Sequence, residues 1–530
     1  MALRVLVSDD LSKEGLAVLR AAPGLSVDVK TSLSPADLLS IIGDYDALAV
    51  RSATQVTAQV FEAARRLKVV GRAGVGVDNI DLAAASRRGV VVMNAPGGSA
   101  VTVAEHTLAM MFALARRIPA ATASVKGGKW EKKRFASGHE LSGKTLGVVG
   151  TGNIGSVVVD RAHGLKMNVV AYDPFISAAA AARLGIELLP LDDLLRRADF
   201  VTLHVPLTDA TKNLIGEKQF LLMKPGAFLV NCARGGLIDE AALARALSGG
   251  RIGGAAFDVF AKEPPPADHP LLAQENFVCT PHLGASTEEA QAAVALAVCE
   301  QIVDFLVRGD VKNAVNVPSV SRELLDRIGP FLTLAERLGA LVGQLAAEHM
   351  TEFRVTVAGA VASEPRRPIA LAALRGLLSH AADAGQVNDV NAPALAAERG
   401  IQLVEETSDR ARDFASLVTV TARGPEGETS AAGTVFGREP RLLRLDHFEV
   451  ESAAEGVLLV LRNQDVPGVV GQIGQTIGTA GLNIARMALS RRTEQKEALA
   501  ILNLDSPAPA AVLDALRALP PVREVHQVQL

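Results

Sequence analysis

The chain has 530 residues, a length that corresponds to roughly three or four domains. Apolar residues make up 49% of it and aromatic residues only 4%, so we expect a folded core built mainly from Ala, Val, Leu and Ile. The formal net charge of -4 is small for this length, with no basic stripe or acidic tail, which argues against nucleic acid and a membrane surface as partners.

The three cysteines are too few and too scattered for a disulfide framework, and no Cys/His cluster has the spacing of zinc ligands, so we expect no metal site. The opening sequence MALRVLVSDD places Asp9 and Asp10 where a signal peptide needs apolar residues. The Ala-rich stretch 287–307 contains several charged residues and therefore predicts an amphipathic helix, not a membrane span. We expect a protein of the reducing cytoplasm.

Short β-branched runs alternate with helical patterns in the first half of the chain, which is typical of βαβ units and a parallel sheet. We expect strands at residues 3–8, 47–50, 68–72 and 91–96. A helix over 101–117 is expected after the last of these strands. A second series begins near residue 141, with strands in TLGVVG, NVVAYD, FVTLHV, AFLVNCA and FVCTPH. Because ligands bind beyond the carboxyl ends of parallel strands, the loops after these strands are the candidate site.

The character of the sequence changes after residue 313. The segment 314–320, AVNVPSV, predicts a linker, and a helix is expected near 323–347, followed by strand patterns such as FRVTVAG without a chemical constellation. From about residue 456 the order of strand and helix patterns is βαββαβ, which predicts a small ferredoxin-like unit.

A glycine-rich motif with Gly150, Gly152 and Gly155 follows the strand pattern GVV and opens a helical pattern. These glycines permit a tight turn and close approach of a pyrophosphate to a helix N-terminus. The next strand pattern ends in Asp173, whose carboxylate can bind the ribose hydroxyls of NAD and would repel the extra phosphate of NADP. The alternative interpretation is a purely structural turn and an ordinary loop acid.

Three later strand ends supply candidate catalytic residues: Arg234, Glu263 and His282. Oxidation of a secondary alcohol needs a base for the hydroxyl proton, and histidine changes protonation near neutral pH. A carboxylate bonded to the imidazole would fix its tautomer, and an arginine would hold a substrate carboxylate through two parallel hydrogen bonds. Each residue alone is also compatible with a solvated loop or a structural histidine, so the hypothesis rests on their order and placement.

Eight short motifs occur in the order of one enzyme family: RSAT (51–54), GRAGVGVDN (71–79), MNAPGG (93–98), GTGNIG (150–155), HVPLT (204–208), NCARGG (231–236), DVFAKEPP (258–265) and TPHLGAST (280–287). The chain thereby resembles the D-isomer-specific 2-hydroxyacid dehydrogenase family. The resemblance implies that the catalytic residues of this α/β family correspond to Arg234, Glu263 and His282. It also implies nucleotide contacts at Asn153, Ile154, Asp173, Val205, Cys232, Ala233, Asp258 and Gly284.

The resemblance further implies two Rossmann-like domains, with an NAD-binding domain (98–283) inserted into a substrate-binding domain (1–97 plus 284–313). Within the family the chain resembles the long phosphoglycerate dehydrogenases, which implies oxidation of D-3-phosphoglycerate to 3-phosphohydroxypyruvate, the first step of L-serine biosynthesis. Arg51 and Arg72 would then bind the substrate, with Arg51 at the phosphate end. The residues 130–134, WEKKR, would lie in a dimerisation segment of a homo-oligomer, with a tetramer favoured; a solvated loop is the alternative.

The C-terminal part is similar to two further modules. The segment 314–452 resembles an α+β intervening domain, most clearly at GQVNDVNAP (385–393), and 453–530 resembles an ACT domain through NQDVPGVVGQIG and AGLNI. An ACT domain implies an amino-acid effector, here L-serine, with Asp465 near its ammonium group and Asn483 bonding across a domain pair. The alternative is that Asp465 caps a helix and Asn483 is a turn residue.

Three rival functions remain open at this point. A glyoxylate or hydroxypyruvate reductase shares the same three catalytic residues, but it has no need for phosphate-binding arginines or for a C-terminal sensor. A non-enzymatic NAD(H)-sensing protein, similar to corepressors of this fold, would bind the nucleotide without turnover. In the third alternative the ACT-like unit serves purely as an assembly interface, and serine has no effect.

Overall fold

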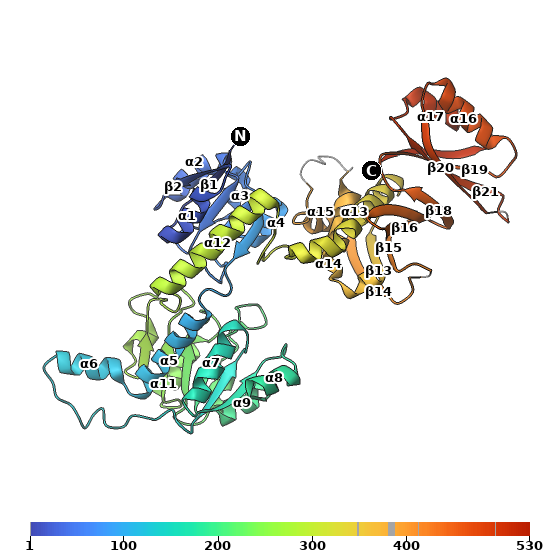
Figure 1. Ribbon diagram of the computed structural model, residues 1–530. Helices are drawn as coiled ribbons and strands as arrows, with labels where there is room; N and C mark the ends of the chain where they lie inside the picture. The colour runs from blue at the N-terminus through green and yellow to red at the C-terminus, as the bar shows by residue number, and fades with distance from the viewer. Residues whose placement is uncertain (1, 347–348, 380–386, 412, 493) are drawn as a thin grey trace.

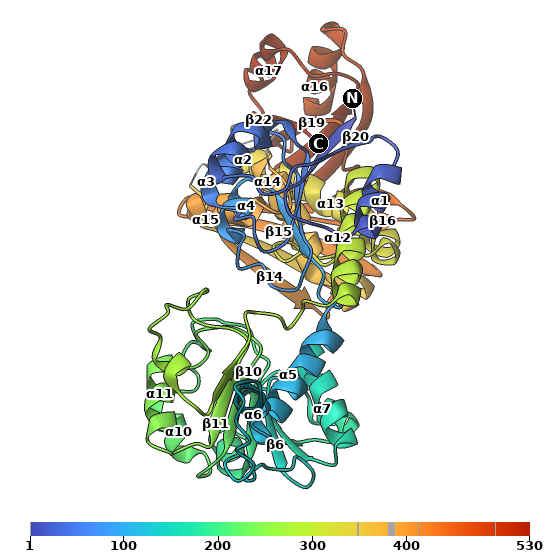
Figure 2. The ribbon, with the colours of Figure 1, turned by 90° about the vertical axis from the view of Figure 1, so that its left-hand side faces the viewer.

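The computed structural model describes residues 2–346, 349–379, 387–411, 413–492 and 494–530. The described part contains four β-sheets, of which the first two are entirely parallel and the last two are mostly antiparallel. Figures 1 and 2 show the first two sheets as separate lobes, coloured blue and green, and the last two in the yellow-to-red part of the chain. The predicted fold class is confirmed, including the insertion of the second lobe into the first.

The first lobe is a five-stranded sheet in the order β2-β1-β3-β4-β5. Its strands are β1 (Leu3–Val7), β2 (Leu25–Val29), β3 (Ala47–Val50), β4 (Val69–Arg72) and β5 (Val91–Asn94). Helices α1 (Lys13–Ala21) and α12 (Glu288–Arg308) cover one face, and the other is covered by α2 (Pro35–Ile41), α3 (Ala58–Ala63) and α4 (Leu82–Arg87). Strand β2 was not predicted from the sequence, because this edge strand is half-exposed and carries Ser26 and Asp28 within its apolar run.

Helix α12 returns the chain to the first lobe after the second lobe is complete (Figure 1). Among the described residues it is the helix that, taken singly, is long and apolar enough to cross a membrane. Its Val298, Cys299 and Ile302 are fully buried, and a Cβ atom on Gly71 of β4 would lie only 2.6 Å from Ile302. Its apolar face therefore packs directly on the first sheet, as expected for an amphipathic helix.

The second lobe is a seven-stranded parallel sheet in the order β12-β11-β10-β9-β6-β7-β8. Its strands are β6 (Thr145–Val149), β7 (Asn168–Tyr172), β8 (Glu187–Leu188), β9 (Phe200–Leu203), β10 (Phe228–Asn231), β11 (Gly254–Phe257) and β12 (Phe277–Cys279). One face carries α5 (Ala100–Ala115), α7 (Asn153–Gly164) and α8 (Ala178–Leu184), and the other carries α9 (Leu191–Arg197), α10 (Glu217–Leu222) and α11 (Glu240–Ser248). Strand β11 was not predicted from the sequence, because GAAF lacks β-branched residues. A Cβ on Gly254 would lie 2.8 Å from Leu114, so this strand packs closely against α5.

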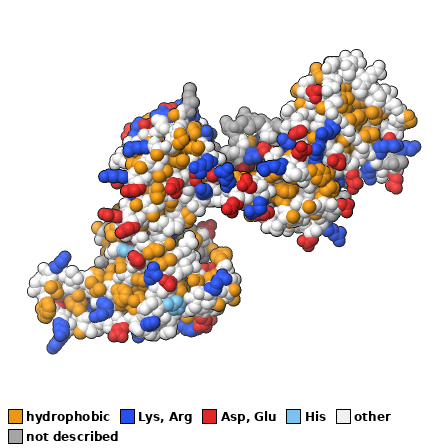
Figure 3. Space-filling model, in the orientation of Figure 1, with side chains coloured by type: hydrophobic (Ala, Val, Ile, Leu, Met, Phe, Trp, Pro, Cys, Tyr) orange, Lys and Arg blue, Asp and Glu red, His pale blue; other side chains and the backbone are white. Residues whose placement is uncertain are grey.

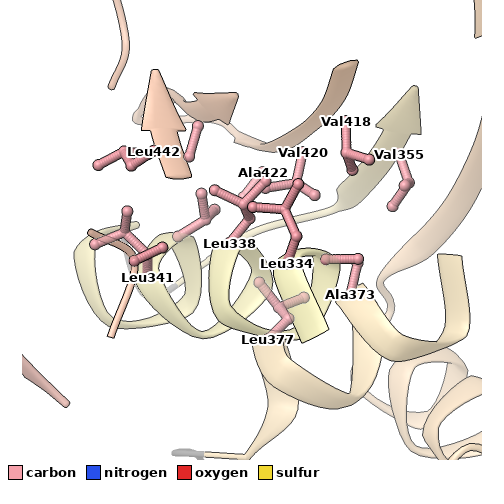
Figure 4. Close-up of a cluster of buried hydrophobic side chains, with 14 of the residues drawn as sticks. Leu334, Leu338, Leu341, Val355, Ala373, Leu377, Val418, Val420, Ala422 and Leu442 are labelled. Atoms are coloured by element: carbon pink, nitrogen blue, oxygen red, sulfur yellow. The ribbon is translucent and has the colours of Figure 1, made fainter. Parts of the chain in front are cut away.

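The third sheet has the order β14-β13-β15-β16-β17-β18. It is formed by β13 (Glu352–Gly359), β14 (Gln402–Ser408), β15 (Ser416–Gly424), β16 (Gly427–Phe436), β17 (Glu439–Leu445) and β18 (Phe448–Ala453). Helices α13 (Arg322–Leu345), α14 (Arg366–Leu378) and α15 (Ala392–Glu398) accompany it, and Leu334, Leu338 and Leu341 of α13 pack against Val420 and Leu442 (Figure 4). Two of the predicted stretches extend beyond the described residues, namely the helix near 323–347 at its end and GQVNDVNAP at 385–386.

The fourth sheet has the antiparallel order β20-β21-β19-β22, which confirms the predicted ferredoxin-like unit. It is built from β19 (Val457–Gln464), α16 (Val469–Thr479), β20 (Ile484–Arg492), β21 (Glu497–Leu504), α17 (Ala510–Arg517) and β22 (Val522–Gln529). Leu459 and Leu502 face the two helices, whereas Leu458 and Ile501 join the core of the third sheet. Figure 3 shows acidic and basic side chains interspersed over the face in view.

Candidate active site

The predicted residues of the second lobe lie at the carboxyl ends of its parallel strands. Strand β6 lies between β9 and β7, so the chain leaves the centre of the sheet in opposite directions. Such a switch point creates a crevice beyond the strand ends, where open parallel sheets bind ligands. Residues 150–155 follow β6 there, and the loops with Arg234, Glu263 and His282 follow β10, β11 and β12.

Each glycine of the motif 150–155 meets a different geometric need. Gly150 has a φ of 90°, and a Cβ atom there would lie 2.6 Å from the carbonyl oxygen of His204. A Cβ on Gly155 would lie 2.0 Å from the carbonyl oxygen of Gly150, because α7 packs directly on the turn. Gly152 faces open space at the start of α7, where no side chain of the described residues caps the helix. This helix N-terminus fits the pyrophosphate of a dinucleotide.

Asp173 is held beside this motif by hydrogen bonds. Its Oδ2 accepts from the backbone N–H and the hydroxyl of Thr151, each at 2.8 Å, and its Oδ1 accepts from the backbone N–H of Phe175 at 3.0 Å. Burial raises the pKa of Asp173, but these hydrogen bonds lower it more, so the net shift is downward. The ionised carboxylate favours NAD, because it would repel the additional phosphate of NADP.

The other implied nucleotide contacts also lie at this edge of the sheet: Asn153, Ile154, Val205, Cys232, Ala233, Asp258 and Gly284. Asp258 is 1% exposed and accepts hydrogen bonds at 2.7 Å from the hydroxyl of Thr280 and from the backbone N–H groups of Leu283 and Gly284. Its Oδ1 also lies 3.3 Å from Nε2 of His106. Burial raises the pKa of Asp258, but these partners, first among them His106, lower it to about 2. Asp258 thereby ties the loop after β12 to the end of β11.

Two titratable side chains at the crevice are held uncharged at neutral pH. Nδ1 of His204 is buried without a hydrogen-bond partner in the described part of the chain, and Nε2 lies 3.0 Å from the hydroxyl of Thr202. Burial lowers the pKa of His204 to about 4 and raises the pKa of the Cys232 thiol to about 12. No role was predicted for His204 from the sequence, where its position in the motif HVPLT is the only feature that singles it out.

His282 and Glu263 form the expected pair, with 2.7 Å between Nδ1 of the imidazole and Oε2 of the carboxylate. Their side chains are 52% and 38% exposed, so the pair is open to the cleft, and it borders a hollow of about 350 Å³. His282 has a φ of 56°, and its backbone N–H donates to the carbonyl oxygens of Asp258 and Thr280, at 2.9 and 3.1 Å. Because Nδ1 is bound to the carboxylate, Nε2 is the nitrogen that can take a proton.

Arg234 is oriented by groups from both lobes. Its Nε donates to Asp78 Oδ2 at 3.1 Å, and its Nη1 donates to the carbonyl oxygen of Ala233 at 2.7 Å. Asn231 is 1% exposed and fixes the turn after β10, because its side chain donates to the carbonyl of Arg234 and accepts from the N–H of Ala233. A Cβ on Gly76 would lie 2.0 Å from Nη2, so glycine at that position leaves room for the guanidinium.

In the first lobe, Arg51 directly follows β3 and Arg72 is the last residue of β4. The backbone N–H of Arg51 donates at 2.6 Å to Asp9, which is 5% exposed and also accepts from the hydroxyl of Thr54. Arg72 is half-buried, and its Nε has no hydrogen-bond partner within the described residues. Burial, and next the positive charge of Arg234, lower the pKa of Arg72, and Arg51 adds to this effect. The structure therefore places the three arginines within electrostatic reach of one another, together with Asp78 and Asp9.

The structure adds contacts that sequence reasoning had not assigned. Asp78 and Asn79 lie within the motif GRAGVGVDN, so the motif itself was the available signal. The amide of Asn79 donates to the carbonyl oxygens of Arg51 and Thr54, at 2.8 and 2.7 Å, and so shapes the loop of Arg51. His106 belongs to α5 and reaches Asp258 only through the fold, so no local pattern could have identified it.

The predicted effector residues lie at opposite ends of α16 in one chain. Asp465 accepts a hydrogen bond from Arg491 Nε at 2.8 Å, and Asn483 donates to Asp505 at 2.8 Å. The alternative that Asp465 caps the helix is wrong, since the N-cap residue of α16 is Gly468 and no side-chain cap bond is present at this end of the helix. Near Asp465, the side chain of Asn463 is 3% exposed, and its Oδ1 has no partner among the described residues.

Comparison with known proteins shows which family the chain belongs to. Residues 108–284 match the family model described as D-isomer specific 2-hydroxyacid dehydrogenase, NAD binding domain. Residues 327–446 match the D-3-phosphoglycerate dehydrogenase intervening domain, and 457–521 match the ACT domain. A D-3-phosphoglycerate dehydrogenase from Methanocaldococcus jannaschii is 44% identical over 530 residues, which cover 100% of both chains. The chain belongs to the D-3-phosphoglycerate dehydrogenase family.

Other members of the D-3-phosphoglycerate dehydrogenase family agree with this assignment. Those from Mycobacterium tuberculosis and Bacillus subtilis are 43% and 38% identical, and each match covers 99% of both chains. Among solved structures, a protein from Thermus thermophilus is 37% identical with a TM-score of 0.55, covering 59% of this chain and 100% of that one. A D-lactate dehydrogenase from Escherichia coli is 29% identical with a TM-score of 0.52, over 59% and 100%. The predictions of an NAD-dependent oxidoreductase and of NAD as its cofactor are confirmed.

Proposed function

We propose that this chain oxidises D-3-phosphoglycerate to 3-phosphohydroxypyruvate, the first step of L-serine biosynthesis. The observation that carries the proposal is the 2.7 Å bond between His282 Nδ1 and Glu263, at the same sheet edge as Arg234 and the dinucleotide motif. Relatives that align over the whole chain carry the name D-3-phosphoglycerate dehydrogenase, which supports this substrate over glyoxylate or hydroxypyruvate.

The chemistry needs a base, a clamp and a hydride acceptor. Bound NAD supplies the acceptor for the hydride from C2 of the substrate. His282 takes the hydroxyl proton on Nε2, and the carboxylate of Glu263 stabilises the imidazolium that forms. Arg234 holds the substrate carboxylate with N–H groups that Asp78 and Ala233 do not occupy, so these two partners set the direction of the guanidinium.

Arg51 and Arg72 supply positive charge for the phosphate end of the substrate. Arg72 is the stronger candidate in this arrangement, because its Nε lacks a partner within the described residues and its charge is destabilised by Arg234. An anion bound beside Arg72 would offset the repulsion between Arg72 and Arg234. Arg51 presents its guanidinium from a loop fixed by Asp9, with one hydrogen bond of 3.3 Å to the carbonyl of Asp10.

The domain boundaries proposed for this activity follow the two passages of the chain between the lobes. The substrate-binding domain comprises 1–97 and 284–313, and the NAD-binding domain comprises 98–283. The first passage lies between β5 and α5 and the second between β12 and α12, so each joins a strand of one sheet to a helix that packs on the other sheet. Closure of the cleft would exclude water from the reacting atoms. The segments 314–452 and 453–530 form the intervening and ACT domains.

We infer that the ACT domain binds L-serine between two copies of the chain. Asp465 can receive the effector's ammonium group by exchanging its bond with Arg491, and the buried carbonyl oxygen of Asn463 can accept a further hydrogen bond. The uncapped N-terminus of α16 suits the effector's carboxylate. Asn483 lies at the far end of α16 and therefore contributes only from the second copy.

The same reasoning favours a homo-oligomer, with a tetramer as our proposal. Trp130 is 83% exposed in the segment 130–134, where Arg134 pairs with Glu275. An exposed indole of this size is typical of a residue buried by a partner subunit. A cytoplasmic location is proposed as well, since Cys232, Cys279 and Cys299 are all free thiols.

The test is NADH formation from D-3-phosphoglycerate at alkaline pH, with the keto product trapped, in the presence of L-serine, D-serine or neither. We expect turnover that L-serine suppresses and D-serine does not. Turnover indifferent to L-serine would keep the dehydrogenase and leave the ACT domain as an assembly module. Activity on glyoxylate alone would favour a reductase, and NADH binding without any turnover would favour a nucleotide-sensing protein.

A further inference from the structure

A second carboxylate–imidazole pair, Glu240 and His269, contacts the loop that carries Glu263. Oε2 of Glu240 lies 3.1 Å from Nε2 of His269, and their side chains are only 15% and 13% exposed. The other oxygen of Glu240, Oε1, accepts a hydrogen bond of 2.7 Å from the backbone N–H of Ala261. One carboxylate therefore holds two points of a single loop, one before Glu263 and one after it.

The loop between these points has few other restraints. It runs from the end of β11 to His269, and its residues 261–264 are exposed. Glu263 uses one oxygen to accept from the backbone N–H of Phe260 at 3.0 Å and the other to bind His282. The ring of Phe260 is 7% exposed and meets the ring of His269 edge-on at 5.7 Å. Buried contacts thus hold the flanks of the loop, while Glu263 itself projects into the cleft.

The tautomer of His269 agrees with this role. Its Nδ1 accepts the backbone N–H of Leu271 at 3.4 Å, so we assign the ring hydrogen to Nε2, which donates it to Glu240. A buried carboxylate with two donors stays in place, whereas removal of it leaves the N–H of Ala261 and the imidazole of His269 without their acceptor.

The Glu240 segment also carries Arg234. Glu240 is the first residue of α11, which begins shortly after the turn that presents the guanidinium. Within that turn, a Cβ on Gly235 would lie 1.9 Å from the carbonyl oxygen of Phe260, so the two backbones are in contact. The segment that aims Arg234 is therefore packed against the loop that carries Glu263 and is bonded to it through Glu240.

We propose that Glu240, together with His269, is a positioning residue that sets the carboxylate of Glu263 against His282. This inference rests on the proposed reaction, because Glu240 does not touch the reacting atoms and acts only through Glu263. Misplacement of a supporting group by about 1 Å can lower turnover by about a hundredfold. Loss of the Glu240 carboxylate should therefore reduce catalysis without weakening NAD binding.

The experiment compares Glu240→Ala, Glu240→Gln and Glu263→Gln with the double variant Glu240→Ala/Glu263→Gln in the full chain. We expect Glu240→Ala to lower kcat about ten- to a hundredfold, with the KM for NAD unchanged. Glu240→Gln keeps an acceptor for the backbone N–H of Ala261, so its kcat should lie between those of the parent and of Glu240→Ala. In the double variant, Glu240→Ala should lower kcat by less than about twofold beyond Glu263→Gln, because both changes act on one group.

Two further readouts separate positioning from general stability. The acid limb of the pH profile of kcat/KM should move in Glu240→Ala in the same direction as in Glu263→Gln. Hydrogen–deuterium exchange of a peptide covering 258–269 should accelerate in Glu240→Ala. The matched control is Glu217→Ala, which removes an exposed carboxylate that pairs with Arg245 of the same helix α11 at 3.2 Å. It should leave kcat, the pH profile and the exchange unchanged.

Several outcomes would overturn the inference. These are a kcat of Glu240→Ala within about twofold of the parent, effects that multiply independently in the double variant, or unchanged exchange of the 258–269 peptide. Failure of the proposed function gives a different result: the unmodified chain would be inactive on D-3-phosphoglycerate. Faster exchange in Glu240→Ala would then still support the anchoring of the loop.

Discussion

Arg234 and Asp78 join the two lobes through a single hydrogen bond of 3.1 Å between Nε and Oδ2. Arg234 follows β10 of the second sheet, and Asp78 lies in the loop after β4 of the first. Because the carbonyl oxygen of Ala233 binds Nη1 at the same time, the guanidinium is held from two sides. Its direction therefore depends on how the two lobes meet, and the proposed binding of the substrate carboxylate depends on the same contact.

Replacement of Arg234 by lysine tests this arrangement. A lysine ammonium cannot form two parallel hydrogen bonds to a carboxylate while also contacting Asp78 and Ala233. We expect Arg234→Lys to lower kcat/KM for D-3-phosphoglycerate by about a hundredfold or more, through loss of two charge-assisted bonds. Steady-state kinetics provides the measurement, and NADH titration by fluorescence is the control, since the Kd should stay the same. Activity within a few-fold of the parent would remove Arg234 from the proposed clamp.

The role of His282 as the base is tested by His282→Asn. This change keeps a polar side chain but removes the group that takes the proton on Nε2. We expect turnover to fall by about 10²–10⁴-fold without loss of NAD binding. Near-normal turnover in this variant would refute the assignment, and loss of NADH binding would point to a structural defect.

Two glycines of the dinucleotide motif form a matched pair. A Cβ on Gly155 would lie 2.0 Å from the Gly150 carbonyl oxygen, so Gly155→Ala should destabilise the fold by roughly 1–3 kcal/mol through overpacking. A Cβ on Gly152 would meet nothing within 4 Å, so Gly152→Ala should fold normally. It should nevertheless weaken NADH binding, because the methyl group occupies the approach of the pyrophosphate. Thermal unfolding and NADH titration distinguish the two effects, and equal behaviour of both variants would contradict this account.

The burial of His204 predicts how the stability of the fold depends on pH. Its pKa is about 4 in the folded protein, against about 6.5 for an unperturbed histidine, because burial disfavours the charged form. The unfolded chain therefore binds a proton first, and stability should be complete above about pH 6.5 and decline as the pH falls towards 4. The loss from this residue is at most about 3 kcal/mol. Urea unfolding between pH 7 and 5 should show a smaller decline for His204→Gln than for the parent, and parallel declines would argue against a neutral buried imidazole.

The effector proposal predicts selective desensitisation. Asn463→Ala removes the buried carbonyl oxygen, and Asp465→Ala removes the carboxylate. Each variant should raise the concentration of L-serine needed for half inhibition by about tenfold or more, because a bond to a charged ammonium group is lost. The kcat without serine should stay the same, because Asn463 lies in β19 and Asp465 directly follows this strand, outside the catalytic lobes. Unaltered inhibition in both variants would place the effector elsewhere.

Much of the fold was predictable because the strands of both catalytic lobes are continuous apolar runs. Five of the strand patterns in the second series correspond to β6, β7, β9, β10 and β12, all followed by loops that carry site residues. Three strands of these lobes were not predicted: Ser26 and Asp28 interrupt β2, β8 has only two residues, and the small residues of β11 match no β-branched pattern. In these cases pairing with neighbouring strands and packing of α5 override weak local preference.

The sequence by itself was sufficient to predict which residues take part in the proposed chemistry, because Arg234, Glu263 and His282 are recognisable from residue type, strand-end position and motif. It also indicated the preference for NAD, through Asp173, the acid that directly follows β7. Only the tertiary structure decided how these groups are held. Asp78 meets Arg234, His106 meets Asp258, and Glu240 anchors the loop of Glu263 across distances in sequence that no local pattern spans. The physical reason is that a hydrogen bond depends on distance and direction in space, and those are fixed only when the sheets and helices have packed.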